Sequence, residues 1–156
     1  ISSFDTAITE SGVPARCVRI ELTESMFATD SEVALEVIGA LAERGHSIAI
    51  DDFGTGTSNL ARLGRFPIDI VKIDRSIIAP LESESARDIE LVESTLRLID
   101  GIGASAVAEG IETPTQALVL RKLGCKLAQG YFYGRPVNPT AFAEQFLLSP
   151  AQTAAH

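Results

Sequence analysis

Short apolar runs alternate along the chain with longer segments whose apolar residues recur at a helical period. The runs at 17–20, 47–50, 69–71 and 104–108 are apolar with little alternation, and 127–132 is a weaker example. Continuous apolar runs of this length are typical of strands that are covered on both faces. The pattern therefore predicts five short buried strands.

Helical periodicity fills the segments between these runs. In 31–44 the apolar residues return every three or four positions, with Asp30 or Ser31 placed as the N-cap and Gly45 as the C-cap. Further helices are predicted at 58–64, 85–99, 114–124 and 141–148. A strand followed by a helix, repeated four times, predicts an α/β fold with a parallel sheet, either a Rossmann sheet or a (β/α) barrel. No GxGxxG follows any expected strand, which weighs against a dinucleotide-binding fold.

Polar side chains gather at the carboxyl end of every expected strand. They are Glu21, Glu24, Asp51, Asp52, Lys72, Asp74, Glu109, Glu112 and Gln129. In a parallel barrel these ends converge on one face, where such enzymes keep their active sites. Glu24 and Glu112 have an alternative role as helix caps or first-turn residues. Asp51 and Asp52 exceed what capping requires, because one side chain is enough for a cap.

The adjacent aspartates Asp51 and Asp52 predict a metal site. Two like charges at the end of a buried strand repel each other, and Lys72 or a cation would offset that repulsion. Carboxylate oxygens without a nearby histidine or cysteine favour Mg²⁺ or Mn²⁺, and adjacent carboxylates suit two cations ~3.5–4 Å apart. Since adjacent residues of a regular strand point to opposite faces, we expect the strand to end before Asp51 and the chain to turn at Gly54 and Gly56.

Composition narrows the class of protein. The chain has 156 residues, 46% hydrophobic residues and a net charge of −8, which predicts one globular domain and disfavours non-specific binding to DNA or anionic membranes. No apolar run approaches the ~18 residues of a membrane span. Cys17 and Cys125 fit no CxxC pattern and are expected to be reduced thiols. We therefore expect a cytoplasmic protein, or the cytoplasmic part of a larger membrane-anchored one.

Five sequence blocks carry a resemblance to a known family. They are IELTES (20–25), DDFGTGTSNL (51–60), FPIDIVKIDRSII (66–78), AEGIET (108–113) and QGYFYGRP (129–136). In order and spacing they resemble the EAL-domain cyclic-di-GMP phosphodiesterases of bacterial second-messenger signalling, over about residues 1–148. The resemblance implies the C-terminal part, about five βα units, of a (β/α)₈ TIM-like barrel whose N-terminal strands are missing.

The resemblance also implies a role for each matching residue. Metal ligands are Glu21, Asp51, Asp52 and Glu109, while catalytic roles fall to Glu109, Lys72 and Gln129; loop and supporting positions are Glu24, Asp74, Glu112, Gly54 and Gly56. Glu109 corresponds to a general base or metal partner, Lys72 to the lysine that holds the attacking water and the phosphate, and Gln129 to a glutamine of the water network. The family hydrolyses cyclic-di-GMP to linear pGpG with Mg²⁺ or Mn²⁺.

One departure from the family concerns what precedes the first residue. The Glu-Ala-Leu tripeptide and a metal-binding asparagine of the family occur nowhere in the 156 residues, and a full barrel needs ~250 residues. We therefore expect a truncated domain at 1–148 with a frayed tail at 149–156, inactive in isolation. A sensor or GGDEF-type domain is expected upstream, and a homodimer is expected because a cut barrel exposes a sheet edge.

Two other functions stay open at this point. If the glutamate and the asparagine are truly lost, the protein is a non-catalytic cyclic-di-GMP receptor or a regulatory EAL module. Another Mg²⁺-dependent barrel enzyme, such as an enolase-like lyase, accounts for the carboxylates but leaves DDFGTG and AEGIET unexplained.

Overall fold

A parallel sheet with helices between its strands forms the body of the molecule. The computed structural model describes residues 2–23, 26, 32–56 and 63–147. The strands are β1 (Arg19–Thr23), β2 (Ser47–Phe53), β3 (Ile70–Ile73), β4 (Ser105–Ala108) and β5 (Leu127–Ala128). The α-helices are α1 (Ser2–Ser11), α2 (Glu32–Glu43), α4 (Arg75–Ile78), α5 (Ala86–Gly101), α6 (Pro114–Lys122) and α7 (Pro139–Phe142). Shorter helical turns are η1 (Ala15–Cys17), η3 (Ala79–Ser83) and the π-turn η4 (Ala143–Leu147).

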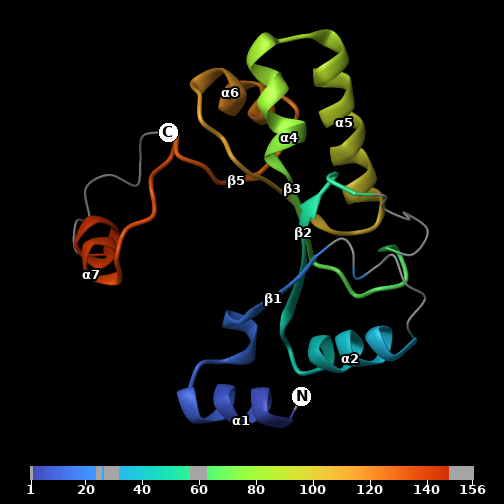
Figure 1. The fold of residues 1–156 in the computed structure, drawn as a ribbon, viewed down its shortest axis with the longest axis vertical. Coiled ribbons are helices and arrows are strands. Elements are labelled where there is room, and N and C mark those ends of the chain that lie inside the picture. The colour runs from blue at the N-terminus through green and yellow to red at the C-terminus, as the bar shows by residue number, and fades with distance from the viewer. Residues whose placement is uncertain (1, 24–25, 27–31, 57–62, 148–156) are drawn as a thin grey trace.

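The order of the strands distinguishes between the two α/β architectures that the sequence left open. The strands pair in parallel in the order β1-β2-β3-β4-β5, so each lies beside the next one along the chain (Figure 1). A Rossmann sheet instead reverses its strand order at a switch point. Consecutive strands with helical crossovers are the arrangement of a (β/α) barrel, and the expected fold, a part of such a barrel, is confirmed.

The core explains why the strands are apolar without alternation. Ile48 and Ile50 of β2 face the main core, where Val71 and Ile73 join them together with residues of α5 and α6. Ala49 lies on the opposite face of β2, packed with Ile70 and Val107 in a second cluster. Both faces of the central strands are therefore covered, as the parallel arrangement requires.

Several element boundaries differ from the sequence prediction. Strand β2 runs through Asp51 and Asp52 to Phe53, whereas β5 is only two residues long and ends before Gln129. Helices α1 and α4 were not predicted, and the last helix begins at Pro139 and continues as a π-turn. Most of the predicted helix 58–64, the caps Asp30 and Ser31 and the tail 149–156 lie outside the described residues.

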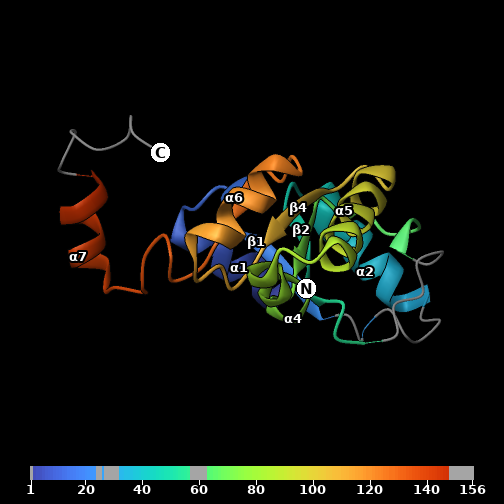
Figure 2. The same cartoon turned by 90° about the horizontal axis from the view of Figure 1, so that it is seen from above.

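The last described part of the chain leaves the sheet. We call residues 131–147 the C-terminal arm. Both views show its helix α7 standing apart from the strands (Figures 1 and 2). Large apolar side chains of the arm are exposed, namely Tyr131, Phe132, Tyr133, Val137, Phe142 and Phe146. Among the described helices, none is both long and apolar enough to cross a membrane.

Candidate active site

Lys72 of β3 is the centre of a cluster of charged side chains. Its Nζ lies 2.7 Å from Asp51 Oδ1, 2.9 Å from Glu109 Oε1 and 3.2 Å from Glu21 Oε2. These acids come from β2, from the residue after β4, and from β1. The sheet brings them together because Lys72 lies one residue before the end of β3, where the carboxyl ends of its neighbours converge.

The environment of Lys72 keeps its ammonium charged. Burial alone would lower the pKa, since only 12% of the side chain is exposed. The hydrogen bonds to Asp51, Glu109 and Glu21 outweigh that effect, and the pKa of Lys72 is raised above its ordinary value. The single ammonium of Lys72 therefore forms ion pairs with three carboxylates.

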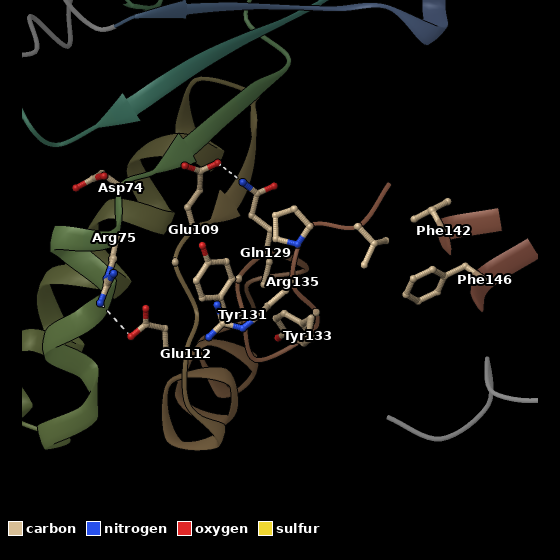
Figure 3. Close-up of a pocket in the computed structure, with 16 residues that line it drawn as sticks. Asp74, Arg75, Glu109, Glu112, Gln129, Tyr131, Tyr133, Arg135, Phe142 and Phe146 are labelled. Atoms are coloured by element: carbon tan, nitrogen blue, oxygen red, sulfur yellow. Dashed lines mark hydrogen bonds and ion pairs between the residues drawn. The ribbon is translucent and has the colours of Figure 1, made fainter. Parts of the chain in front are cut away.

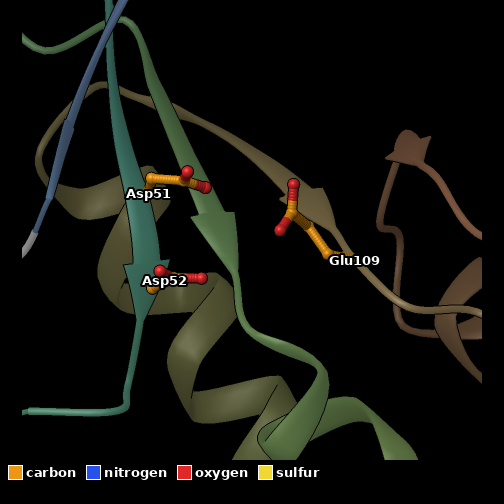
Figure 4. Close-up of side chains that lie close together, drawn as sticks. All are labelled: Asp51, Asp52 and Glu109. Carbon is orange, nitrogen blue, oxygen red and sulfur yellow. The ribbon is translucent and has the colours of Figure 1, made fainter.

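The paired aspartates reach the same side of β2 by a route that the sequence did not reveal. Ile50 pairs with Val71 and Phe53 pairs with Ile73, so β2 uses three steps where β3 uses two, which is a bulge of one residue. Asp52 takes a left-handed conformation, with a φ of 54°. Inside a regular strand the two side chains would point to opposite faces, but here both point toward Glu109 (Figure 4).

The expectation that β2 ends before Asp51 and that the glycines produce the turn is therefore wrong. The irregularity lies at Asp52 itself, a residue type that tolerates left-handed backbone better than most. Gly54 follows with a φ of 104°, and its Cα packs on Ile77, which would lie 2.2 Å from an added Cβ. The backbone and hydroxyl of Thr55 donate hydrogen bonds to the carbonyl of Asp52. Gly54 and Gly56 thus belong to a turn that closes after the aspartates.

Asp51, Asp52 and Glu109 form a cluster that fits a hard divalent cation. One oxygen from each lies within 4.8 Å of the others (Figure 4). All three donors are carboxylates, the ligand type that Mg²⁺, Mn²⁺ and Ca²⁺ prefer, so the residues fit the divalent metal that the resemblance implies. Glu21 reaches the same region through Lys72 but is not a member of this close group.

Glu109 is partly buried and lies near other negative charges. Burial is the main cause that raises its pKa above the ordinary carboxyl value, and the charges of Asp51 and Glu21 add to it, against the opposing effect of Lys72. Gln129, the residue after β5, donates a hydrogen bond of 2.6 Å from Nε2 to Glu109 Oε1. The backbone holds this pair in register, because Gln129 N donates to Ala108 O. Lys72 and Gln129 therefore contact the same carboxylate oxygen, Oε1 of Glu109.

Asp74 serves as the N-cap of α4. Its Oδ1 accepts a hydrogen bond of 2.8 Å from the backbone of Ser76. Hydrogen bonding with the Ser76 side chain, and then with its backbone, lowers the pKa of Asp74. The cap fixes the turn that follows Lys72.

Glu112 is an ion-pair partner rather than the cap that was its alternative role. Its Oε2 lies 2.9 Å from Arg75 Nη2. The cap of α6 is Thr113, which forms a capping box with Gln116. Glu24 lies outside the described residues.

A pocket of about 850 Å³ extends from the cluster toward the C-terminal arm. Glu109, Gln129 and Asp74 line one part of it, and the other lining residues include Arg75, Glu112, Tyr131, Tyr133, Arg135, Phe142 and Phe146 (Figure 3). The guanidinium of Arg135 lies 4.4 Å from the centre of the Tyr131 ring. Sequence reasoning did not single out Arg75, Tyr131 or Arg135. An arginine directly after the strand-end Asp74, and the aromatic run after Gln129, are the signals that could have found them.

Comparisons with known proteins place this arrangement in a family. A family model for the EAL domain matches residues 1–136. The cyclic di-GMP phosphodiesterase NbdA of Pseudomonas aeruginosa is 39% identical over 141 residues, which are 90% of this chain and 18% of NbdA. The matched residues therefore span less than a fifth of this relative's length.

Solved structures of two proteins show the same fold. The EAL domain of Mycobacterium smegmatis DcpA superposes with a TM-score of 0.85 and 37% identity, over 92% of this chain and 64% of that one. A manganese and cyclic-di-GMP complex of Klebsiella pneumoniae BlrP1 gives a TM-score of 0.78 and 32% identity, over 86% of this chain and 34% of that one. A calcium and cyclic-di-GMP complex of the same protein matches equally well.

Proposed function

The chain belongs to the EAL domain family, and from this premise we propose that the protein that contains it is a metal-dependent phosphodiesterase that hydrolyses cyclic-di-GMP to linear pGpG. The observation that carries the proposal is the cluster of Asp51, Asp52 and Glu109 oxygens within 4.8 Å, with Lys72 bound to two of these acids. NbdA is a cyclic di-GMP phosphodiesterase, and BlrP1 binds cyclic-di-GMP together with manganese, which supports the same ligand and the same class of ion here.

The proposed metal ligands are Asp51, Asp52, Glu109 and Glu21. When bound, Mg²⁺ or Mn²⁺ would activate a water and stabilise the oxygens of an in-line phosphoryl displacement. A site with four carboxylates and one ammonium has a surplus of three negative charges, since −4 and +1 give −3. That surplus favours divalent cations over a single monovalent one.

The other groups of the cluster act on the water and the phosphate. We assign Lys72 to a non-bridging phosphate oxygen and to the attacking water, because its ammonium stays charged and lies within the acidic cluster. Glu109 would take the proton of that water, because its carboxylate lies within the cluster and contacts both Lys72 and Gln129. Gln129 orients the Glu109 carboxylate through its 2.6 Å hydrogen bond.

Turnover by the natural full-length protein tests this proposal. With Mg²⁺ or Mn²⁺ present, we expect cyclic-di-GMP to be converted to pGpG, and we expect Asp52→Asn to reduce kcat by at least about a hundredfold, as is typical when a catalytic metal or charge partner is lost. Asp100→Asn is the matched control, since Asp100 is an exposed aspartate of α5 outside the pocket. Absence of pGpG under conditions where a known phosphodiesterase reacts completely would contradict the proposal.

A receptor without catalysis is the alternative that the same experiment separates. Binding of cyclic-di-GMP in the presence of a chelator, without turnover when Mn²⁺ is restored, would favour the receptor. The isolated 156 residues are predicted to be inactive, and measurable hydrolysis by the purified chain would show that prediction to be wrong.

A further inference from the structure

Gly130 follows Gln129 at a point where strand β5 has already ended. The strand is Leu127–Ala128, and its two residues give only two pairings with β4. The Gln129 amide nevertheless lies 2.6 Å from Oε1 of Glu109, which belongs to the loop after β4 (Figure 3). Contacts beyond the strand must therefore fix the backbone from which Gln129 extends.

Hydrogen bonds to the backbone of Ile111 continue the pairing beyond β5. Ile111 N donates to Gln129 O at 3.1 Å, and Phe132 N donates to Ile111 O at 3.0 Å. Gln129 N also donates to Ala108 O, at 2.8 Å. We call these three hydrogen bonds the Ile111 clamp. Gly130 lies between the two residues that bind Ile111, so the clamp encloses it.

The clamp brings two backbones closer together than a side chain at position 130 would permit. An added Cβ would lie 2.1 Å from O and 2.3 Å from N of Ile111. At Gly54 and Gly110 the nearest atoms belong to side chains, which can move, whereas at Gly130 they belong to the backbone. Ile111 resists displacement because its side chain is fully buried in the main core. A side chain at position 130 would therefore displace the segment that carries Gln129.

We propose that Gly130 is a positioning residue for the reaction: by leaving room for the Ile111 clamp, it sets the distance between the Gln129 amide and the Glu109 carboxylate. This inference rests on the proposed function for the role of Glu109. The clamp holds one partner of that contact, and a hydrogen bond of 3.0 Å from Glu109 N to Ile73 O holds the other. Loss of a group that hydrogen-bonds to a metal-binding carboxylate typically costs about 10- to 100-fold in metal affinity or activity.

Two other roles of Gly130 make different predictions. If the glycine serves only the fold, its replacement should lower stability and leave the activity of the folded molecules unchanged. If it serves the C-terminal arm, whose first turn it begins by accepting a hydrogen bond of 3.0 Å from Tyr133 N, its replacement should act independently of Gln129. A role through Gln129 predicts instead that the effects of changing the two residues do not add.

A double-mutant cycle on the natural full-length protein tests the proposed role. Gly130→Ala fills the space that the clamp needs, and Gln129→Asn shortens the amide side chain while leaving the glycine in place. With saturating Mn²⁺, each change should lower kcat for cyclic-di-GMP about tenfold or more and keep KM within about threefold of the wild type. The double variant should lose no more than the larger of the two single losses. Mn²⁺ affinity, measured by calorimetry without nucleotide, should follow the same pattern and needs no turnover.

Matched controls are available on α5. Gly101 is an exposed glycine at which an added Cβ would meet nothing within 4 Å, so Gly101→Ala should leave kcat and Mn²⁺ affinity within about twofold of the wild type. Val92 is fully buried, and Val92→Ala should lower the melting temperature without lowering kcat of the folded protein. The first control tests the substitution itself, and the second tests whether lost stability is enough to reduce activity.

The positioning role is overturned if Gly130→Ala behaves like Gly101→Ala, if it only lowers the melting temperature as Val92→Ala does, or if it fails to fold. It is also overturned if Gln129→Asn keeps the wild-type kcat and Mn²⁺ affinity, or if the two losses multiply in the double variant. Absence of turnover by the wild type contradicts the phosphodiesterase, whereas the cycle in Mn²⁺ affinity still decides the role of Gly130. Turnover without loss in Gly130→Ala contradicts only the positioning role, and a wild type that binds no Mn²⁺ contradicts both.

Discussion

The centre of the sheet and the C-terminal arm place their apolar side chains in opposite environments. Ile50 in β2 and Val71 in β3 are fully buried among residues of several elements. Phe142 and Phe146 in the arm pack on each other, with ring centres 4.9 Å apart, yet about half of each side chain is exposed. The sheet is therefore held by its core, whereas the arm is held mainly by local contacts.

This difference matters because the pocket joins the two regions. Its acidic part, with Glu109 and Gln129, is attached to strands whose positions the core fixes, while Tyr131, Phe142 and Phe146 come from the arm. Catalysis requires positions accurate to about 0.5 Å, which a packed sheet can provide. We infer that the carboxylate cluster retains its geometry independently of the arm, and that the aromatic part of the pocket depends on where the arm lies.

Truncation of a large apolar side chain should give the largest difference in stability between the two regions. Ile50→Ala removes a fully buried side chain from the core and should reduce the free energy of unfolding by about 3 kcal/mol. Phe146→Ala removes a larger side chain that is 54% exposed and should change it by about 0.5 kcal/mol or less. Urea denaturation followed by circular dichroism measures both. Equal losses would show that the arm is part of the cooperative core and would remove the distinction.

Removal of a positive charge should give the second-largest difference in stability between the two regions. Lys72→Met leaves Asp51, Glu109 and Glu21 without their common cation and should destabilise the metal-free protein by about 2 kcal/mol. Arg135, a cation of the arm, lies over the ring of the exposed Tyr131, so Arg135→Met should cost about 0.5 kcal/mol. Thermal unfolding in EDTA compares the two variants.

A titration with Mn²⁺ tests the comparison between these two variants further. Addition of Mn²⁺ should recover more stability in Lys72→Met than in Arg135→Met, because divalent cations replace the lost positive charge only in the acidic cluster. If Lys72→Met is as stable as the wild type in EDTA, the carboxylates do not repel one another as inferred.

Much of the sheet could be predicted from the sequence, because its strands are short apolar runs whose signal is local. The polar ends of those strands were equally visible, and parallel topology then brings Glu21, Asp51, Lys72 and Glu109 together without further information. The hydrophobic pattern did not reveal the bulge at Asp52, since a bulge depends on the register with β3 and on a left-handed backbone that apolar periodicity does not report.

The lining of the pocket was harder to predict for a different reason. Arg75 and Glu112 are 37 residues apart and meet only through the tertiary fold. Thr113 provides the cap that was the alternative role of Glu112, because the capping box with Gln116 satisfies two backbone donors at once. Helix α4 is a single turn, which is too short to show a helical period of apolar residues. Its start is indicated in the sequence by the capping residue Asp74.

Helix caps provide a smaller contrast, of about 1 kcal/mol. Asp74 caps α4 beside the sheet, and Asn138 caps α7 in the arm by accepting a hydrogen bond of 2.9 Å from Ala141. Asp74→Ala should lower the global free energy of unfolding by about 1 kcal/mol, whereas Asn138→Ala should only fray α7 and leave the global value unchanged. Hydrogen exchange measured by mass spectrometry separates local from global opening. Global destabilisation by Asn138→Ala would contradict the weak attachment of the arm.

The two caps also differ in their response to pH. The folded state lowers the pKa of Asp74 through the hydrogen bond from Ser76, so its contribution is present above the ordinary carboxyl pKa and is lost as the pH falls through the lowered value. The amide of Asn138 does not titrate. The difference in stability between wild type and Asp74→Ala should therefore shrink in acid, while the Asn138→Ala difference stays constant.

The smallest expected effect is the pH dependence of stability that Glu109 contributes. Its sign is opposite to that of Asp74. Burial, with the charges of Asp51 and Glu21, raises the pKa of Glu109 in the folded protein, so the folded state binds this proton more tightly than the unfolded chain does. Its contribution to stability is fully present below the ordinary carboxyl pKa and is lost as the pH rises through the raised value. Glu109→Gln replaces the carboxyl group with an amide, which is neutral at every pH. The stability of this variant relative to the wild type should therefore increase with pH in EDTA. Mn²⁺ should cancel this trend in the wild type, because a bound cation favours the ionised carboxylate. A pH-independent difference between Glu109→Gln and the wild type would mean that Lys72 already compensates Glu109 in full, and that the acidic cluster needs no further cation.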